Sequence, residues 1–119
     1  MFELTINDKV FSFNFGIGFV REINKTVQVE QYGVKEDAGL TMALTRVYDG
    51  NAVALVDVLD LANKGREPRV SKKELEDYID DPETDIDALF EKVIGFFKTS
   101  NATKKQATKL LKGLEEAEQ

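Results

Sequence analysis

The chain has 119 residues, the size of one domain, and its 42% of hydrophobic residues suffices for one buried core. A net charge of −6 argues against duplex nucleic acid as a partner, and the absence of cysteine excludes a disulfide framework. No apolar run approaches the ~20 residues of a transmembrane helix, and the N-terminus does not resemble a signal peptide. We therefore expect a cytosolic protein without membrane contact.

The N-terminal segment alternates apolar and polar residues on both sides of a turn. Residues 2–6 and 10–15 flank Asn7-Asp8-Lys9, and this period-two pattern predicts two strands joined as a hairpin. One face of the hairpin carries Phe11, Phe13 and Phe15. Because an isolated hairpin is only marginally stable in water, helices must cover this face.

Apolar residues recur at helical intervals along most of the remaining chain. The predicted helices span residues 17–26, 38–48, 52–62, 71–81, 85–97 and 103–119. Residues 28–36 are poorly patterned and are interpreted as a connection with a turn at Tyr32-Gly33. Residues 63–69 are predicted to be an exposed loop, with Gly65 ending the preceding helix.

Local signals support several of these helix boundaries. Asn51 is a good N-cap for helix 52–62. The β-branched residues of this segment would also permit a buried strand. Its apolar residues lie on nearly every side, which predicts a central helix packed all round. Ser71 and Glu74 form a capping box. Pro82 ends helix 71–81, and Thr84 or Asp85 caps the next helix.

The C-terminal segment is amphipathic and basic. Ala107, Leu110, Leu111 and Leu114 form a narrow apolar stripe in a polar setting, so the helix either docks on its own domain or is available to another chain. The predicted fold is α+β: an N-terminal β-hairpin packed on a mainly α-helical domain of four to five helices, followed by this C-terminal amphipathic helix. We divide the chain into a domain of residues 1–99 and a tail helix of residues 100–119.

Charge is distributed unevenly along the second half of the chain. Residues 74–91 are strongly acidic, whereas residues 98–112 contain five lysines and no acid. Such asymmetry suits a protein that meets copies of itself or a charged partner, although two solvated helix faces would give the same pattern. No aromatic residue is interleaved with the lysines, which argues against nucleic acid.

The residue types needed for common catalytic chemistry are missing. Without histidine and cysteine the chain lacks the usual general base, the thiol nucleophile and the usual zinc ligands. Gly16-x-Gly18 is too short for a phosphate loop. Residues 80–87 are acidic but lack the ligand spacing and the glycine of a calcium loop. We expect no enzyme activity, no catalytic residue, no cofactor and no metal site.

Apolar helix surface is in excess of what one small core needs. We expect Phe96 to be exposed beside the apolar stripe of helix 85–97. With the leucines of the tail helix it would form a surface for a partner protein, because exposed apolar patches often mark such sites. The candidate partner-binding residues are Phe96, Leu110, Leu111 and Leu114. The alternative is that the tail helix closes the core.

Several segments together resemble the tail assembly chaperones of long-tailed phages and prophages of Gram-positive bacteria. They are residues 2–16, 19–24, 39–40, 49–59, 70–71, 75–80, 85–91 and 98–104. The resemblance implies a non-enzymatic morphogenesis factor in the host cytoplasm that is absent from the mature virion. It also implies two partners: the tape measure protein, which such chaperones coat, and the tail tube protein that replaces them.

On this interpretation, the chaperone keeps the tape measure protein soluble, associates with itself, and uses the acidic segment 74–91 for solubility. Two alternatives remain. One is an adaptor or regulatory protein of a mobile element that binds one host protein, and the other is a structural tail component.

Overall fold

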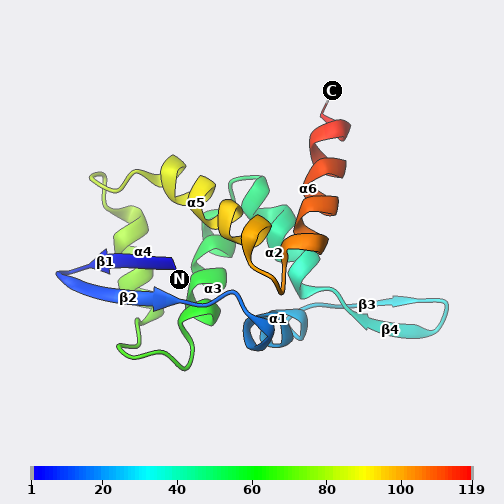
Figure 1. Ribbon diagram of the computed structural model, residues 1–119, viewed down its shortest axis with the longest axis horizontal. Helices are drawn as coiled ribbons and strands as arrows, with labels where there is room; N and C mark the ends of the chain where they lie inside the picture. Colours follow the sequence, from blue (N-terminus) through cyan, green and yellow to red (C-terminus); the bar gives the residue numbers. More distant parts are fainter. Residues whose placement is uncertain (1, 119) are drawn as a thin grey trace.

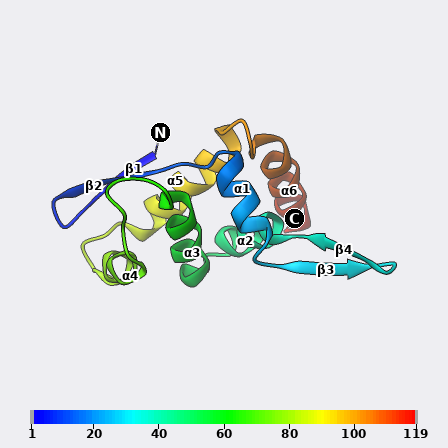
Figure 2. The same ribbon diagram turned by 90° about the horizontal axis from the view of Figure 1, so that it is seen from below.

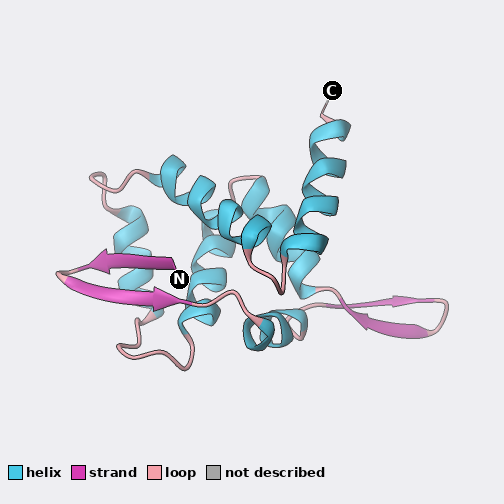
Figure 3. Ribbon diagram, viewed as in Figure 1, coloured by secondary structure: helices cyan, strands magenta, loops and turns pink. Residues whose placement is uncertain are grey.

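The computed structural model describes residues 2–118 and contains two β-hairpins and six helices in that range. The elements are β1 (Phe2–Ile6), β2 (Lys9–Phe13), α1 (Ile17–Asn24), β3 (Gln28–Gln31), β4 (Val34–Asp37), α2 (Gly39–Tyr48), α3 (Ala52–Asn63), α4 (Lys72–Asp80), α5 (Ile86–Thr99) and α6 (Lys104–Ala117). The helices form the body, and the hairpins lie at opposite ends of its long axis (Figures 1 and 3). The predicted α+β class with an N-terminal hairpin is confirmed.

The first hairpin has the buried face that its sequence predicts, but its turn is one residue shorter, because Lys9 already pairs with Ile6 as the first residue of β2. β1 and β2 pair antiparallel, with Phe2 opposite Phe13 and Leu4 opposite Phe11. Asn7 and Asp8 form the two-residue turn with positive φ values of 53° and 65°, the geometry that matches the twist of the flanking strands. Every phenylalanine of this hairpin is buried.

Aromatic rings join the first hairpin to the helices. The ring of Phe2 lies 5.5 Å from that of Phe13, and the ring of Phe15 lies 5.1 Å from the rings of both Phe19 in α1 and Phe97 in α5. These edge-to-face contacts add to the free energy gained by burying the rings. The core is therefore continuous from the hairpin into α1 and α5.

α3 is the central helix, but its first turn is not packed all round. Leu55, Val58 and Leu59 are fully buried, whereas Val53 is 72% exposed. The Asn51 side chain accepts a hydrogen bond from the Ala54 amide, as its N-cap position predicts. Ala52, Val53 and Asp57 are exposed, so the expectation of a helix packed all round is wrong for the N-terminal half of α3.

The predicted boundaries of α4 and α5 agree with the cap geometry. Ser71 and Glu74 make the reciprocal bonds of a capping box at α4. Asp85, not Thr84, caps α5 by accepting from the Ala88 amide at 3.1 Å. The Thr84 hydroxyl instead donates to the Tyr78 carbonyl, which ties the connection back to the end of α4.

Residues 28–36 are not an unpatterned connection. Residues 28–37 form β3 and β4, which pair antiparallel as a second hairpin. Tyr32 and Gly33 do form the turn, with φ values of 54° and 77°. The strands escaped sequence analysis because each has four residues and a single valine, too few for a visible period of two.

The interpretation of residues 63–69 as an exposed loop is wrong at its first residue. Asn63 is the last residue of α3 and is fully buried. Its side chain bonds to the backbone of Ser12, Pro68 and Val70. An asparagine is buried here because these backbone groups satisfy its hydrogen bonds.

α6 docks on its own domain, beside α2 and α5 (Figure 2). Ala107 and Leu111 are buried, and the buried Thr103 hydroxyl donates to the Phe97 carbonyl at 2.7 Å. At the far end the Tyr48 hydroxyl donates to Glu118 at 2.9 Å, and this bond raises the pKa of Tyr48. The tail helix thus closes part of the core.

Candidate functional site

The four predicted contact residues lie in three different environments. Phe96 is half-buried, because its ring packs 4.9 Å from that of Phe2 and 6.1 Å from that of Phe15. Leu111 is only 1% exposed. Leu110 and Leu114 are half-buried and reach the surface.

Leu110 and Leu114 form an apolar groove on the outer face of α6. The groove has a volume of about 350 Å³ and is lined by Gln106, Lys109, Leu110, Gly113 and Leu114. These residues recur at three- and four-residue steps and therefore share one helix face. Gly113 has no side chain and no neighbouring atoms where a Cβ would lie, so the hollow beside the two leucines stays open. We call this feature the α6 groove.

One of the four exposed lysines of α6, Lys109, lines the α6 groove. Lys104, Lys105, Lys109 and Lys112 are exposed. None of the four ion pairs found among residues 2–118 involves these lysines. The groove therefore combines an apolar floor with one cation, Lys109, that has no ion-pair partner in the described part of the chain.

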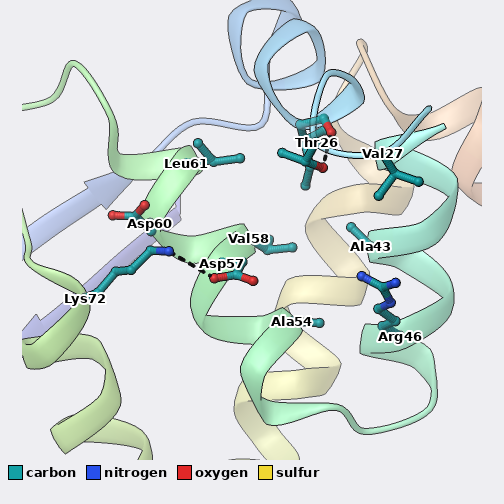
Figure 4. Close-up of a pocket in the computed structure, with 12 residues that line it drawn as sticks. Thr26, Val27, Ala43, Arg46, Ala54, Asp57, Val58, Asp60, Leu61 and Lys72 are labelled. Atoms are coloured by element: carbon teal, nitrogen blue, oxygen red, sulfur yellow. Dashed lines mark hydrogen bonds and ion pairs between the residues drawn. The ribbon is translucent and has the colours of Figure 1, made fainter. Parts of the chain in front are cut away.

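A second recess opens between α1, α2 and α3 (Figure 4). We call it the α2–α3 cleft; its volume is about 340 Å³. Val27, Ala43, Ala54, Val58 and Leu61 supply its apolar lining. Its polar lining includes Arg46 and the Asp57–Lys72 ion pair of 3.3 Å. Sequence analysis missed this cleft because its residues come from segments far apart in the chain.

The second hairpin, which we call the arm (residues 28–37), is exposed along its whole length. Tyr32 is 96% exposed, Val34 57% and Val29 44%. Sequence analysis missed this surface too. The one available signal was the Tyr-Gly turn flanked by valines on either side.

The chemistry of these features is that of contact surfaces. Within residues 2–118 no group of three or more acidic, histidine or cysteine side chains is placed to hold a metal ion. No helix of the described chain is long and apolar enough to cross a membrane. What the described residues offer is apolar recesses with charged rims and an exposed hairpin, features that suit segments of other proteins.

The fold and its surfaces define a small α+β protein with an apolar groove, an open cleft and a projecting arm. The sequence model of the phage tail assembly chaperone family (TAC) matches residues 3–112. The match covers most of the chain, so this protein belongs to that family, and the resemblance to tail assembly chaperones seen in the sequence is confirmed. No curated protein and no solved structure matched the chain.

Proposed function

We propose that this tail assembly chaperone binds helical segments of the tape measure protein and keeps them soluble until the tail tube protein encloses them. The role is non-catalytic, is carried out in the host cytoplasm by self-associating copies, and leaves the chaperone outside the mature virion. The observation that carries the proposal is the α6 groove, an apolar surface on a member of a tail assembly chaperone family.

The α6 groove suits an amphipathic helix as its ligand. Leu110 and Leu114 are one helical turn apart on α6, so they can receive apolar side chains that a client helix presents at the same interval. The hollow at Gly113 admits a side chain between them. Leu111 supports the groove from the core side and makes no direct contact with the client.

Charge limits the strength of this contact and keeps it reversible. Lys109 attracts an acidic position beside the client's apolar stripe, and salt screens such an exposed attraction. Weak contacts repeated over many copies still hold a long client, while each can be displaced in turn. The exposed acids of segment 74–91 keep the coated client soluble.

Phe96 is a second proposed client contact. Its ring lies over Phe2, and the Lys92 ammonium lies 4.9 Å from the centre of the Phe2 ring. Phe96 thus lies at the edge of the aromatic core and is half-buried, so part of its ring is accessible to a neighbouring chain.

The test is co-expression of the chaperone with the tape measure protein. We expect Leu110→Asp combined with Leu114→Asp to move the client into the insoluble fraction, because two carboxylates would lie where apolar side chains must pack. The control is Val10→Asp combined with Ile17→Asp, which changes two apolar residues of β2 and α1 that are 52% and 59% exposed. This control should keep the client soluble.

A second variant separates binding from folding. Gly113→Glu puts a carboxylate into the groove without a clash, because no atoms surround that position. It should also abolish solubilisation while the circular dichroism spectrum and melting temperature stay near those of the parent. A Gly113→Glu chaperone that still protects the client would refute the α6 groove as its site.

A further inference from the structure

A third recess opens between α3 and α4. We call it the α3–α4 groove; its volume is about 360 Å³. Its apolar lining includes Val53, Val56 and Ile79. Val56 is buried and Ile79 half-buried, but Val53 is 72% exposed. An apolar side chain left this open beside other apolar groups is typical of a surface that another protein covers.

The charged residues that line the α3–α4 groove are mainly acidic. Asp57, Glu76 and Asp80 stand against one cation, Lys72, which gives a net charge of −2. Lys72 is already paired with Asp57 at 3.3 Å. Glu76 and Asp80 are exposed, and neither belongs to the four ion pairs found among residues 2–118. The groove therefore favours a ligand that combines apolar side chains with positive charge.

The α6 groove of this same chain has that combination. Its apolar floor is bordered by Lys109. Lys105 and Lys112 lie four residues before Lys109 and three after it, so the three ammonium groups follow one face of α6. Glu116 continues this row at its C-terminal end, and the row has a net charge of +2.

We propose that the α3–α4 groove of one copy binds the α6 groove of a second copy. Charge selects this pairing, because an acidic surface meets a basic one, whereas two α3–α4 grooves or two α6 grooves would bring like charges together. Shape agrees with charge. The exposed Val53 side chain can fill the hollow at Gly113, where a Cβ would meet no atom within 4 Å, as side chains of one helix pack into the hollows of another.

The contact joins different copies. α4 and α6 lie on opposite sides of the body (Figures 1 and 2), so the α6 groove of a chain cannot reach its own α3–α4 groove. The pairing is therefore head to tail. Each pair of copies keeps one free groove of each kind, and association continues into a chain or closes into a ring.

This inference rests on the proposed function and adds a form of regulation to it. The second copy and the client occupy the same α6 groove, so each excludes the other. Without client, a neighbouring copy covers Leu110 and Leu114, and a client helix must displace that copy to bind. The test of the contact needs no client, so its failure and the failure of client binding are distinguishable.

Sedimentation velocity of the full chain over a concentration series tests the contact. The parent should form species larger than a monomer. Val53→Glu adds a carboxylate to the acidic groove and Gly113→Glu fills the hollow of the α6 groove, so each should raise the dissociation constant by more than about tenfold. The control is Val10→Glu, the same change at a position of β2 that is 52% exposed, which should associate as the parent does.

An equal mixture of the Val53→Glu and Gly113→Glu chains separates this pairing from other contacts. The first chain keeps its α6 groove and the second keeps its α3–α4 groove, so the mixture should form one-to-one dimers and nothing larger. Misfolded variants could not regain binding in this way. A monomeric parent, a single variant that associates as the parent does, or a mixture as dissociated as its components would overturn the proposal.

Charge reversal tests the complementarity by the same measurement. Glu76→Lys with Asp80→Lys should weaken association, and so should Lys105→Glu with Lys109→Glu. The chain that carries all four substitutions should recover most of the lost affinity, because opposite charges face each other again. A fourfold variant that is as weak as either pair would contradict selection of the second copy by charge.

Discussion

Gly39→Ala should be among the most damaging single substitutions in this chain, with an expected loss of about 3 kcal/mol or more of unfolding free energy. Gly39 is buried at the start of α2, where a Cβ would overlap the Ile23 carbonyl group of α1. Backbone atoms cannot move aside as a flexible side chain can. The two helices would have to separate, breaking the 3.0 Å bond from the Leu40 amide to the Asn24 side chain.

Chemical denaturation of Gly39→Ala against the parent measures this effect. Gly95→Ala in α5 is the matched control, because its Cβ would meet no atom within 4 Å. The control should keep the parent's stability or gain about 0.5–1 kcal/mol, since alanine is the better helix former. Equal denaturation midpoints for the two variants would show that the close approach of α1 and α2 at Gly39 does not contribute to stability.

The contact at Gly39 also bears on the arm. The Ala38 amide donates to the Val27 carbonyl at 2.8 Å, closing the base of the second hairpin directly beside Gly39. Separation of α1 from α2 would therefore change the direction in which the arm projects.

Asn63→Ala should cost about 3 kcal/mol, the second large effect. The Asn63 amide nitrogen donates to the Ser12 carbonyl at 2.9 Å and to the Pro68 carbonyl at 3.2 Å. Its oxygen accepts from the Val70 amide at 2.8 Å and from Arg69 at 3.0 Å. Removing the side chain leaves buried backbone groups without partners, at about 1–3 kcal/mol for each group that water cannot reach.

Asn63→Asp separates hydrogen bonding from volume in the same denaturation experiment. Aspartate has nearly the same shape but, when ionised, only accepts hydrogen bonds, so it would face the Ser12 and Pro68 carbonyls without a donor. We expect a loss at neutral pH comparable to that of Asn63→Ala. Asn101→Ala, at an exposed turn, should change stability by less than about 0.5 kcal/mol. A stable Asn63→Asp variant would mean that cavity volume, not bonding, governs this site.

Sequence analysis located those elements whose signals are local. The first hairpin was recoverable because its alternation is long and its turn residues tolerate positive φ. The side chains of the caps Asn51, Ser71 and Asp85 accept hydrogen bonds from amides three residues later. Each cap can therefore be recognised from neighbouring positions in the sequence. The family resemblance could likewise be seen in the linear chain.

The candidate site was only partly predictable. The stripe on the tail helix was correctly located, but Leu110 and Leu111 differ by about 100° around the helix axis, and sequence cannot tell which of them faces the body. Packing against α2 and α5 buries Leu111 and leaves Leu110 at the groove. Phe96 was expected at the surface, yet it is half-buried, because its ring packs against that of Phe2, which is distant in the chain.

What the sequence determined by itself is the family, the α+β class, the first hairpin and most helix boundaries, because periodicity and capping act over a few residues. Only the tertiary structure decided that the arm is an exposed hairpin, that Asn63 is buried, and where the groove and the cleft open. Those features depend on which distant segments meet, and the packing of the whole core sets those contacts.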